Sequence, residues 1–151
     1  MRAAVLAEFG HLTLVDAPVP QPEHGEVLCR VLACGLCGTD LKIVSGAYRG
    51  TWPPSLPFII GHEWSGVIVA MGPGTERSGL EVGDRVVAEN HAGCGQCPMC
   101  RSGRYNLCER VREPGFKLYG HTAPGALAQY AARPATATAP SPTRSARAWT
   151  S

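Results

Sequence analysis

Four cysteines within fifteen residues constrain the fold of this chain more than any other feature of its sequence. They follow the spacing C-x2-C-x2-C-x7-C and are Cys94, Cys97, Cys100 and Cys108. Four thiolates this close can converge on one tetrahedral Zn²⁺ ion, with Zn–S distances of about 2.3 Å. Because four protein ligands leave no open position, the spacing predicts a structural zinc site in a lobe formed by residues 94–108. An iron–sulfur cluster, a redox pair at Cys97 and Cys100, and unrelated thiols are the weaker alternatives.

The composition indicates the cellular setting of this site. The chain has 151 residues and seven cysteines, an odd and clustered set, and its N-terminus has no secretory signal pattern. Reduced, metal-binding thiols are therefore favoured over a disulfide framework. No apolar run approaches the ~20 residues of a membrane helix. We therefore expect a cytoplasmic protein that does not act at a membrane.

The net charge of +2 is unevenly distributed along the chain. Residues 1–131 carry 11 Lys and Arg against 12 Asp and Glu, a balance of −1, whereas residues 132–151 add three arginines and no acid. The basic balance belongs to the C-terminal segment alone, so no nucleic-acid partner is expected.

Short apolar runs separated by turn residues predict a mainly β fold with short helices. Residues 26–33 alternate with a period of two, residues 66–72 form an apolar β-rich run, and a Gly-Asp turn begins another strand at residues 82–88. A short helix is expected to start near Thr39 or Asp40. Many short strands with regular turns favour a β-barrel or a sandwich.

Residues 132–151 differ in character from the rest of the chain. They hold six Ala, four Thr, three Pro, three Ser and three Arg, but no Leu, Ile, Val, Phe or acid. Such a segment buries too little apolar surface to offset the entropy lost on ordering it. We therefore expect a disordered low-complexity tail, and a frameshift in the encoding gene is our hypothesis for its origin.

A second, dispersed set of residues has the composition of a catalytic metal site. Cys37 lies in the segment GLCGTD, and His62 and Glu63 lie in the segment GHEWSG. A thiolate, an imidazole and a neighbouring carboxylate are ligands of catalytic zinc sites that keep one position open. Taken alone, each residue is ambiguous, because a lone cysteine at a strand end is more often a core thiol and a lone histidine more often structural.

Together these motifs resemble, in their order along the chain, the N-terminal catalytic domain of the zinc-dependent medium-chain alcohol dehydrogenase family. The resemblance covers about residues 1–131, rests on GLCGTD, GHEWSG, VGDRV and the four-cysteine segment, and is greatest for the polyol (sorbitol-like) and threonine dehydrogenase branch. It implies a GroES-like β-barrel with a four-cysteine zinc lobe, a catalytic zinc, and NAD(P) held by a Rossmann domain. That domain is not expected here, because no segment fits the G-x-G-x-x-G pattern.

The resemblance also implies roles for single residues. Cys37 and His62 match the first two ligands of the catalytic zinc, and Glu63 matches the acid beside the metal, which ligates it in some members. Thr39 matches the catalytic hydroxyl that binds the substrate alcohol and passes its proton outward. The lobe cysteines match the structural zinc ligands. Asp40 is expected either to orient His62 through its second ring nitrogen or to cap the helix.

Two departures from the family pattern bear on activity. Lys42 stands where many members carry a relay histidine, and no Asp, Glu or Cys follows Glu113, so the third catalytic ligand is absent unless Glu63 replaces it. We therefore expect a truncated part, inactive alone, of an NAD(P)-dependent dehydrogenase that oxidises a secondary alcohol to a ketone. For a full-length relative, the resemblance implies a small alcohol or polyol substrate and a homo-oligomeric assembly.

Two functions of other classes stay open on the sequence alone. A stand-alone zinc-binding interaction module without dehydrogenase activity would use the arginines of the lobe to contact a nucleic-acid backbone. A solvated lobe surface explains the same arginines more simply. A co-chaperonin-like barrel would share the fold but would have no use for Cys37, His62 or the lobe cysteines, and a fold alone does not assign a function.

Overall fold

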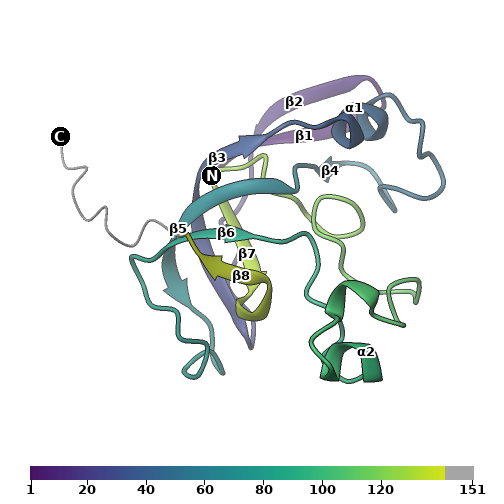
Figure 1. Ribbon diagram of the computed structural model, residues 1–151. Coiled ribbons are helices and arrows are strands. Elements are labelled where there is room, and N and C mark those ends of the chain that lie inside the picture. The colour runs from purple at the N-terminus through teal and green to yellow at the C-terminus, as the bar shows by residue number, and fades with distance from the viewer. Residues whose placement is uncertain (142–151) are drawn as a thin grey trace.

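The computed structural model describes residues 1–141, which form two antiparallel sheets (Figure 1). The smaller sheet has the strand order β2-β1-β4, with β1 at Arg2–Glu8, β2 at His11–Asp16 and β4 at Phe58–Ile59. The larger sheet has, in strand order, β7 (Tyr130–Pro134), β3 (Glu26–Gly35), β5 (Glu63–Met71), β6 (Arg85–Ala88) and β8 (Thr138–Pro140). The helical segments are short: α1 (Gly38–Val44), α2 (Pro98–Arg101), and the 3-10 turns η1 (Tyr105–Leu107) and η2 (Ala135–Ala137).

The larger sheet curls toward a barrel because of how its last strands are connected. β7 and β8 are its two edge strands, yet only the three residues of η2 join them in the chain. A connection this short keeps the end of β7 near the start of β8, so the sheet between these two edges must curl (Figure 1). The mainly β fold with short helices that the sequence predicts is confirmed, and its larger sheet curls toward a barrel.

Two apolar clusters hold this arrangement together. The first fills the curled sheet and includes Val27, Trp64, Ile68 and Val86. Their alternation along β3 and β5 is the period-two pattern read from the sequence, since successive side chains of a strand point to opposite faces. The second cluster joins the smaller sheet to α1 and consists of Leu6, Ile43, Phe58 and Ile60. The segment that leads to His62 is therefore anchored in the core on its N-terminal side.

The prediction of disorder from residue 132 onward is wrong for residues 132–140. β7 pairs with β3, and β8 pairs with β6. Composition misled the prediction because small residues and one arginine, not large apolar residues, fill the space here: Arg133 is 2% exposed, and Ala135 and Ala137 are buried. The predicted tail beyond residue 141 lies outside the described residues.

The described part of the chain contains no dinucleotide-binding unit. Every pair of named strands in residues 1–141 is antiparallel, whereas a Rossmann domain is built from parallel strands joined by helices. The Rossmann domain that the resemblance implies for full-length members therefore does not lie within residues 1–141. Among the same residues, no helix has the length and apolar character needed to cross a bilayer.

Candidate metal centres

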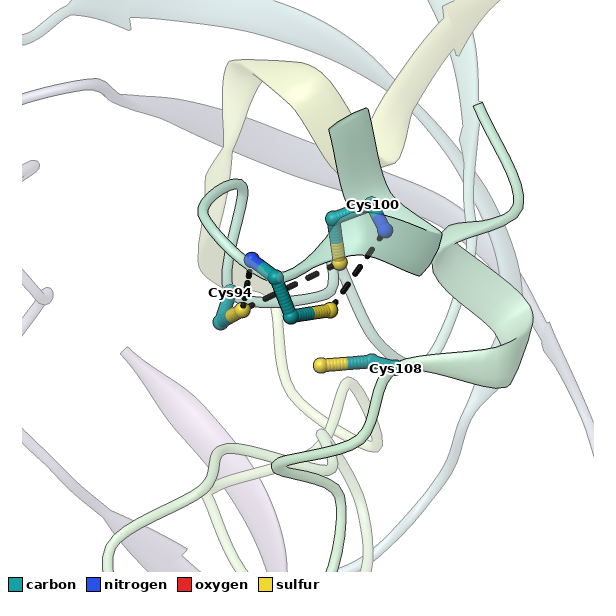
Figure 2. A group of neighbouring side chains, drawn as sticks. Cys94, Cys100 and Cys108 are labelled. Carbon is teal, nitrogen blue, oxygen red and sulfur yellow. Dashed lines mark hydrogen bonds between the residues drawn. The ribbon is translucent and has the colours of Figure 1, made fainter. Parts of the chain in front are cut away.

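The four cysteines of the lobe come together as their spacing predicts. Cys97 caps α2, Cys100 lies within it, and Cys108 follows η1. The four sulfur atoms all lie within 4.8 Å of one another, and Cys94 Sγ is 3.9 Å from Cys100 Sγ. Figure 2 shows Cys94, Cys100 and Cys108 pointing toward one another. A tetrahedral zinc with Zn–S bonds of 2.3 Å requires S–S separations of about 3.8 Å, so these free thiols fit the ion.

Backbone amides prepare two of these sulfurs to act as thiolates. Cys94 Sγ accepts from the amides of Gln96 at 3.4 Å and Cys97 at 3.3 Å, and Cys97 Sγ accepts from the amide of Cys100 at 3.4 Å. These donors lower the pKa of Cys94 to about 6 and also lower the pKa of Cys97. Burial raises the pKa of Cys100 to about 11, and binding of a metal to this thiol would release its proton.

Tyr105 ties the lobe to the larger sheet. Its hydroxyl donates to Glu89 Oε1 at 2.7 Å, and the Glu89 amide donates to Ala137 O at 2.9 Å. The bond to Glu89 raises the pKa of Tyr105, because it stabilises the protonated phenol. His91, which the sequence left unplaced, packs against the Tyr105 ring at a centroid distance of 6.0 Å. Folding of the lobe around its cysteines is thereby coupled to the barrel.

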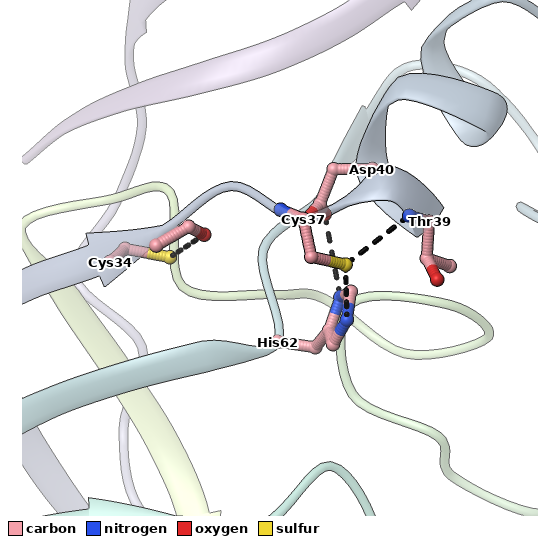
Figure 3. Close-up of polar contacts among 6 residues, drawn as sticks. Cys34, Cys37, Thr39, Asp40 and His62 are labelled. Atoms are coloured by element: carbon pink, nitrogen blue, oxygen red, sulfur yellow. Dashed lines mark hydrogen bonds and ion pairs between the residues drawn. The ribbon is translucent and has the colours of Figure 1, made fainter.

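The second centre forms where the chain enters α1 and β5 (Figure 3). Cys37 Sγ lies 3.3 Å from His62 Nε2. Zinc bound to one sulfur and one imidazole nitrogen would hold these atoms about 3.6 Å apart. Cys37 also caps α1, since its sulfur accepts from the Thr39 amide at 3.2 Å and Asp40 Oδ2 accepts from the Cys37 amide at 3.0 Å. The helix start that the sequence predicts is therefore the feature that positions Cys37.

Asp40 contacts both partners of this centre. Its side chain is 1% exposed, and its Oδ1 lies 3.4 Å from His62 Nδ1. Neither of these atoms has a hydrogen-bond partner elsewhere in residues 1–141. The carboxylate thus caps the helix and also holds the ring of His62 so that Nε2 faces Cys37, as second ring nitrogens of metal-binding histidines are commonly held.

Glu63, the other predicted ligand, lies apart from this centre. Among the described residues, the group whose ligand atoms all lie within 4.8 Å of one another contains Cys37, Asp40 and His62 but not Glu63. Glu63 is exposed and begins β5, where it pairs with Gly35. Thr39, the predicted catalytic hydroxyl, lies beside the Cys37 sulfur at the start of α1 (Figure 3).

An aromatic wall flanks the second centre, and the sequence did not place it there. The His121 ring lies 4.5 Å from the His62 ring, the Trp52 ring 4.8 Å from His121, and the Tyr48 ring 5.0 Å from Trp52. Burial and the nearby His62 lower the pKa of His121, which favours the neutral imidazole. Tyr48 and Trp52 lie in one loop, and His121 comes from another that is far away in the sequence, so no spacing signal could have joined His121 to them.

Comparisons with known proteins agree with this geometry. The sequence model described as "Alcohol dehydrogenase GroES-like domain" matches residues 23–143, which extends the resemblance twelve residues beyond residue 131. An L-threonine 3-dehydrogenase of Pyrococcus horikoshii is 44% identical over 125 residues, covering 81% of this chain and 33% of the relative. The sorbitol dehydrogenase of Bacillus subtilis is 41% identical over 112 residues, covering 74% of this chain and 31% of the relative.

A solved structure extends the agreement to the fold. The cobalt- and zinc-bound thermostable alcohol dehydrogenase from Pyrobaculum aerophilum has a TM-score of 0.82 and 36% identity, covering 94% of this chain and 41% of that one. The chain spans about a third of the length of the curated relatives it matches. With the matched domain, the barrel and the cysteine cluster in agreement, the chain belongs to the zinc-type medium-chain alcohol dehydrogenase family and corresponds to its N-terminal GroES-like domain.

Proposed function

We propose that this chain is the zinc-binding catalytic domain of an NAD(P)-dependent dehydrogenase that oxidises a secondary alcohol to a ketone. Cys37 and His62 hold the catalytic zinc, and the four lobe cysteines hold the structural zinc. The observation that carries the proposal is the approach of Cys37 Sγ to His62 Nε2, 3.3 Å apart, with the buried carboxylate of Asp40 behind the ring.

The residues around the second centre have distinct tasks in this proposal. A zinc ion supplies Lewis acidity, which polarises the alcohol oxygen and lowers its pKa. Thr39 binds the substrate hydroxyl and passes its proton outward, and Asp40 keeps His62 in the orientation that presents Nε2. The wall of Tyr48, Trp52 and His121 shields this side of the centre from water. Glu63 lies outside the group formed by Cys37, Asp40 and His62. Its exposed side chain would have to turn toward the metal in order to bind it.

The hydride acceptor in this proposal is NAD(P), which a full-length relative binds in its second domain. Residues 1–141 hold no such unit, so the chain alone is not expected to reduce NAD(P). The relatives named above act on threonine and sorbitol, which supports a small hydroxyl-bearing substrate and the polyol or threonine branch. A homo-oligomeric assembly stays part of the proposal for the full-length protein. No comparison favours the stand-alone interaction module.

Cobalt substitution tests the catalytic centre without requiring turnover. We expect the Co²⁺-loaded chain to bind two ions and the visible absorption of one of them to change when 2-propanol is added, because an open position at the Cys37–His62 centre admits the alcohol. Cys37→Ser should lose the alcohol-sensitive part of the spectrum and keep the rest. Cys34→Ser is the matched control, since Cys34 is a nearby thiol outside both groups. An unchanged alcohol response in Cys37→Ser would contradict the proposal.

A further inference from the structure

The barrel interior contains a buried cation that neither metal centre uses. Arg133 is 2% exposed, and its guanidinium carbon lies 4.3 Å from the ring centroid of Tyr119 and 5.4 Å from that of Trp64. Burial lowers the pKa of Arg133 to about 10, which leaves it charged at neutral pH. Among the ion pairs of residues 1–141, none involves Arg133. The charge therefore has no paired carboxylate in the described part of the chain.

The unpaired donors of Arg133 lie on one edge of its guanidinium. Nη1 donates to Ala132 O at 2.6 Å, but Nε and Nη2 are buried and have no hydrogen-bond partner in residues 1–141. The N–H bonds of Nε and Nη2 run parallel on the same side of the group. This is the fork with which arginine binds both oxygens of a carboxylate. Buried donors left without an acceptor are unfavourable, so an acceptor with two adjacent oxygens would stabilise the site.

Glu26, the carboxylate whose charge acts on Arg133, is already engaged by other donors. Its Oε2 accepts from the Glu23 amide at 3.1 Å, and its Oε1 accepts from the Tyr119 hydroxyl at 3.5 Å. Lys117 Nζ lies 3.8 Å from the same Oε1 and 3.7 Å from Glu23 Oε2. Lys117 thus balances these carboxylates, and the fork of Arg133 stays free for a ligand.

A pocket of about 430 Å³ lies against these residues. Arg133, Tyr119 and Lys117 line it together with apolar residues that include Pro18, Ile59 and Pro124. Glu23 and Glu26 line it as well, and Lys117 Nζ lies within 4 Å of both carboxylates. Its volume falls within the range of small-molecule sites in proteins. None of its lining residues belongs to either metal centre. The pocket is therefore separate from the site of the proposed dehydrogenase chemistry.

We propose that this pocket binds a small carboxylate with an apolar body, whose two oxygens accept from Nε and Nη2 of Arg133. The apolar body packs against the proline and isoleucine wall. Both nitrogens are closed to solvent in the ligand-free chain, so the carboxylate enters by displacing the ring of Tyr119, which lines the pocket and stacks on the guanidinium.

Calorimetric titration of the zinc-loaded full chain with benzoate tests this proposal, and benzamide serves as the matched ligand of similar size without charge. We expect saturable binding of one benzoate per chain and binding of benzamide that is about tenfold weaker or less, because the amide lacks the second acceptor oxygen and the negative charge. Equal binding of the two ligands, or no binding of benzoate, would overturn the proposal and leave ordered water as the partner of Arg133.

Two variants locate the binding. Arg133→Lys keeps the positive charge but loses the paired donors, and it should weaken benzoate binding about tenfold. Ala17→Trp places a large side chain at the half-buried rim of the pocket, leaves Arg133 intact and should abolish benzoate binding. This variant tests the pocket independently in case Arg133→Lys fails to fold. Circular dichroism and zinc content report the fold of each variant. Benzoate binding at wild-type strength in folded Ala17→Trp would refute the assignment.

Discussion

Replacing Cys97 with serine is expected to release one zinc ion per chain and to lower the free energy of unfolding by about 4 kcal/mol. Cys97 is buried and lies at the start of α2. Its sulfur accepts from the Cys100 amide and caps α2. A serine hydroxyl can take over this cap, so the substitution removes chiefly the metal ligand. Because Tyr105 joins the lobe to the sheet through Glu89, the effect should extend into the barrel. Thermal unfolding and metal analysis measure both changes.

Chelation supplies the internal control for this variant. When zinc is removed from both proteins, the difference in unfolding free energy should shrink to the few tenths of a kcal/mol expected for a lost side-chain contact. Cys34→Ser, in a half-buried thiol outside both metal groups, should keep full zinc content. If Cys97→Ser retains the zinc content of the wild type, the lobe is not a four-thiolate site.

Replacing Gly125 with alanine is expected to destabilise the chain by about 3 kcal/mol and to disturb the second centre. A Cβ at Gly125 would lie 2.2 Å from Ile60 O and 2.5 Å from Gly61 O, both backbone atoms. The same segments are hydrogen-bonded, since the Gly125 amide donates to Ile59 O at 2.6 Å and the Leu127 amide donates to Ile60 O at 3.0 Å. The methyl group must push these two segments apart, and the segment at residues 60–61 leads directly into His62.

Gly38→Ala is the matched control for this prediction. No atom lies within 4 Å of a Cβ built at Gly38, and the position lies in the first turn of α1. An alanine there should change stability by less than about 1 kcal/mol, in the stabilising direction, because alanine favours helix more than glycine does. Chemical denaturation of the two variants, with zinc content measured in parallel, compares them. Equal stability of the two variants would show that the close approach at Gly125 is not a structural requirement.

The sequence predicts the metal centres well because their ligands are marked by local spacing. The lobe cysteines lie on two tight turns, so their convergence follows from short-range geometry alone. The pairing of Cys37 with His62 is long-range, and only the family resemblance joined them. The two roles of Asp40 could be foreseen from the helix start. A side chain three residues after a helix-capping residue commonly accepts a hydrogen bond from the backbone amide of that residue. Here the same carboxylate also lies beside the imidazole of His62.

Other features could not be predicted, because they depend on side chains that meet only in the folded chain. Residues 132–140 appear disordered by composition, yet the space left by the curled sheet suits alanines and the long side chain of Arg133. His121 lies far from the metal motifs in sequence and reaches His62 through a loop that hydrogen-bonds to residues 59–61. Glu63 shares a motif with His62, but its exposed position at the start of β5 keeps it away from the cluster of Cys37, Asp40 and His62.

Zinc content combined with X-ray absorption at the zinc edge tests the central claim most directly. We expect two zinc ions per chain, one with four sulfur ligands and one with a single sulfur and imidazole nitrogen, which averages to about 2.5 sulfurs per zinc. One zinc per chain with sulfur ligands only would contradict the assignment of Cys37 and His62 as a catalytic centre. If the chain binds no zinc even after reconstitution with added zinc, both sites are contradicted.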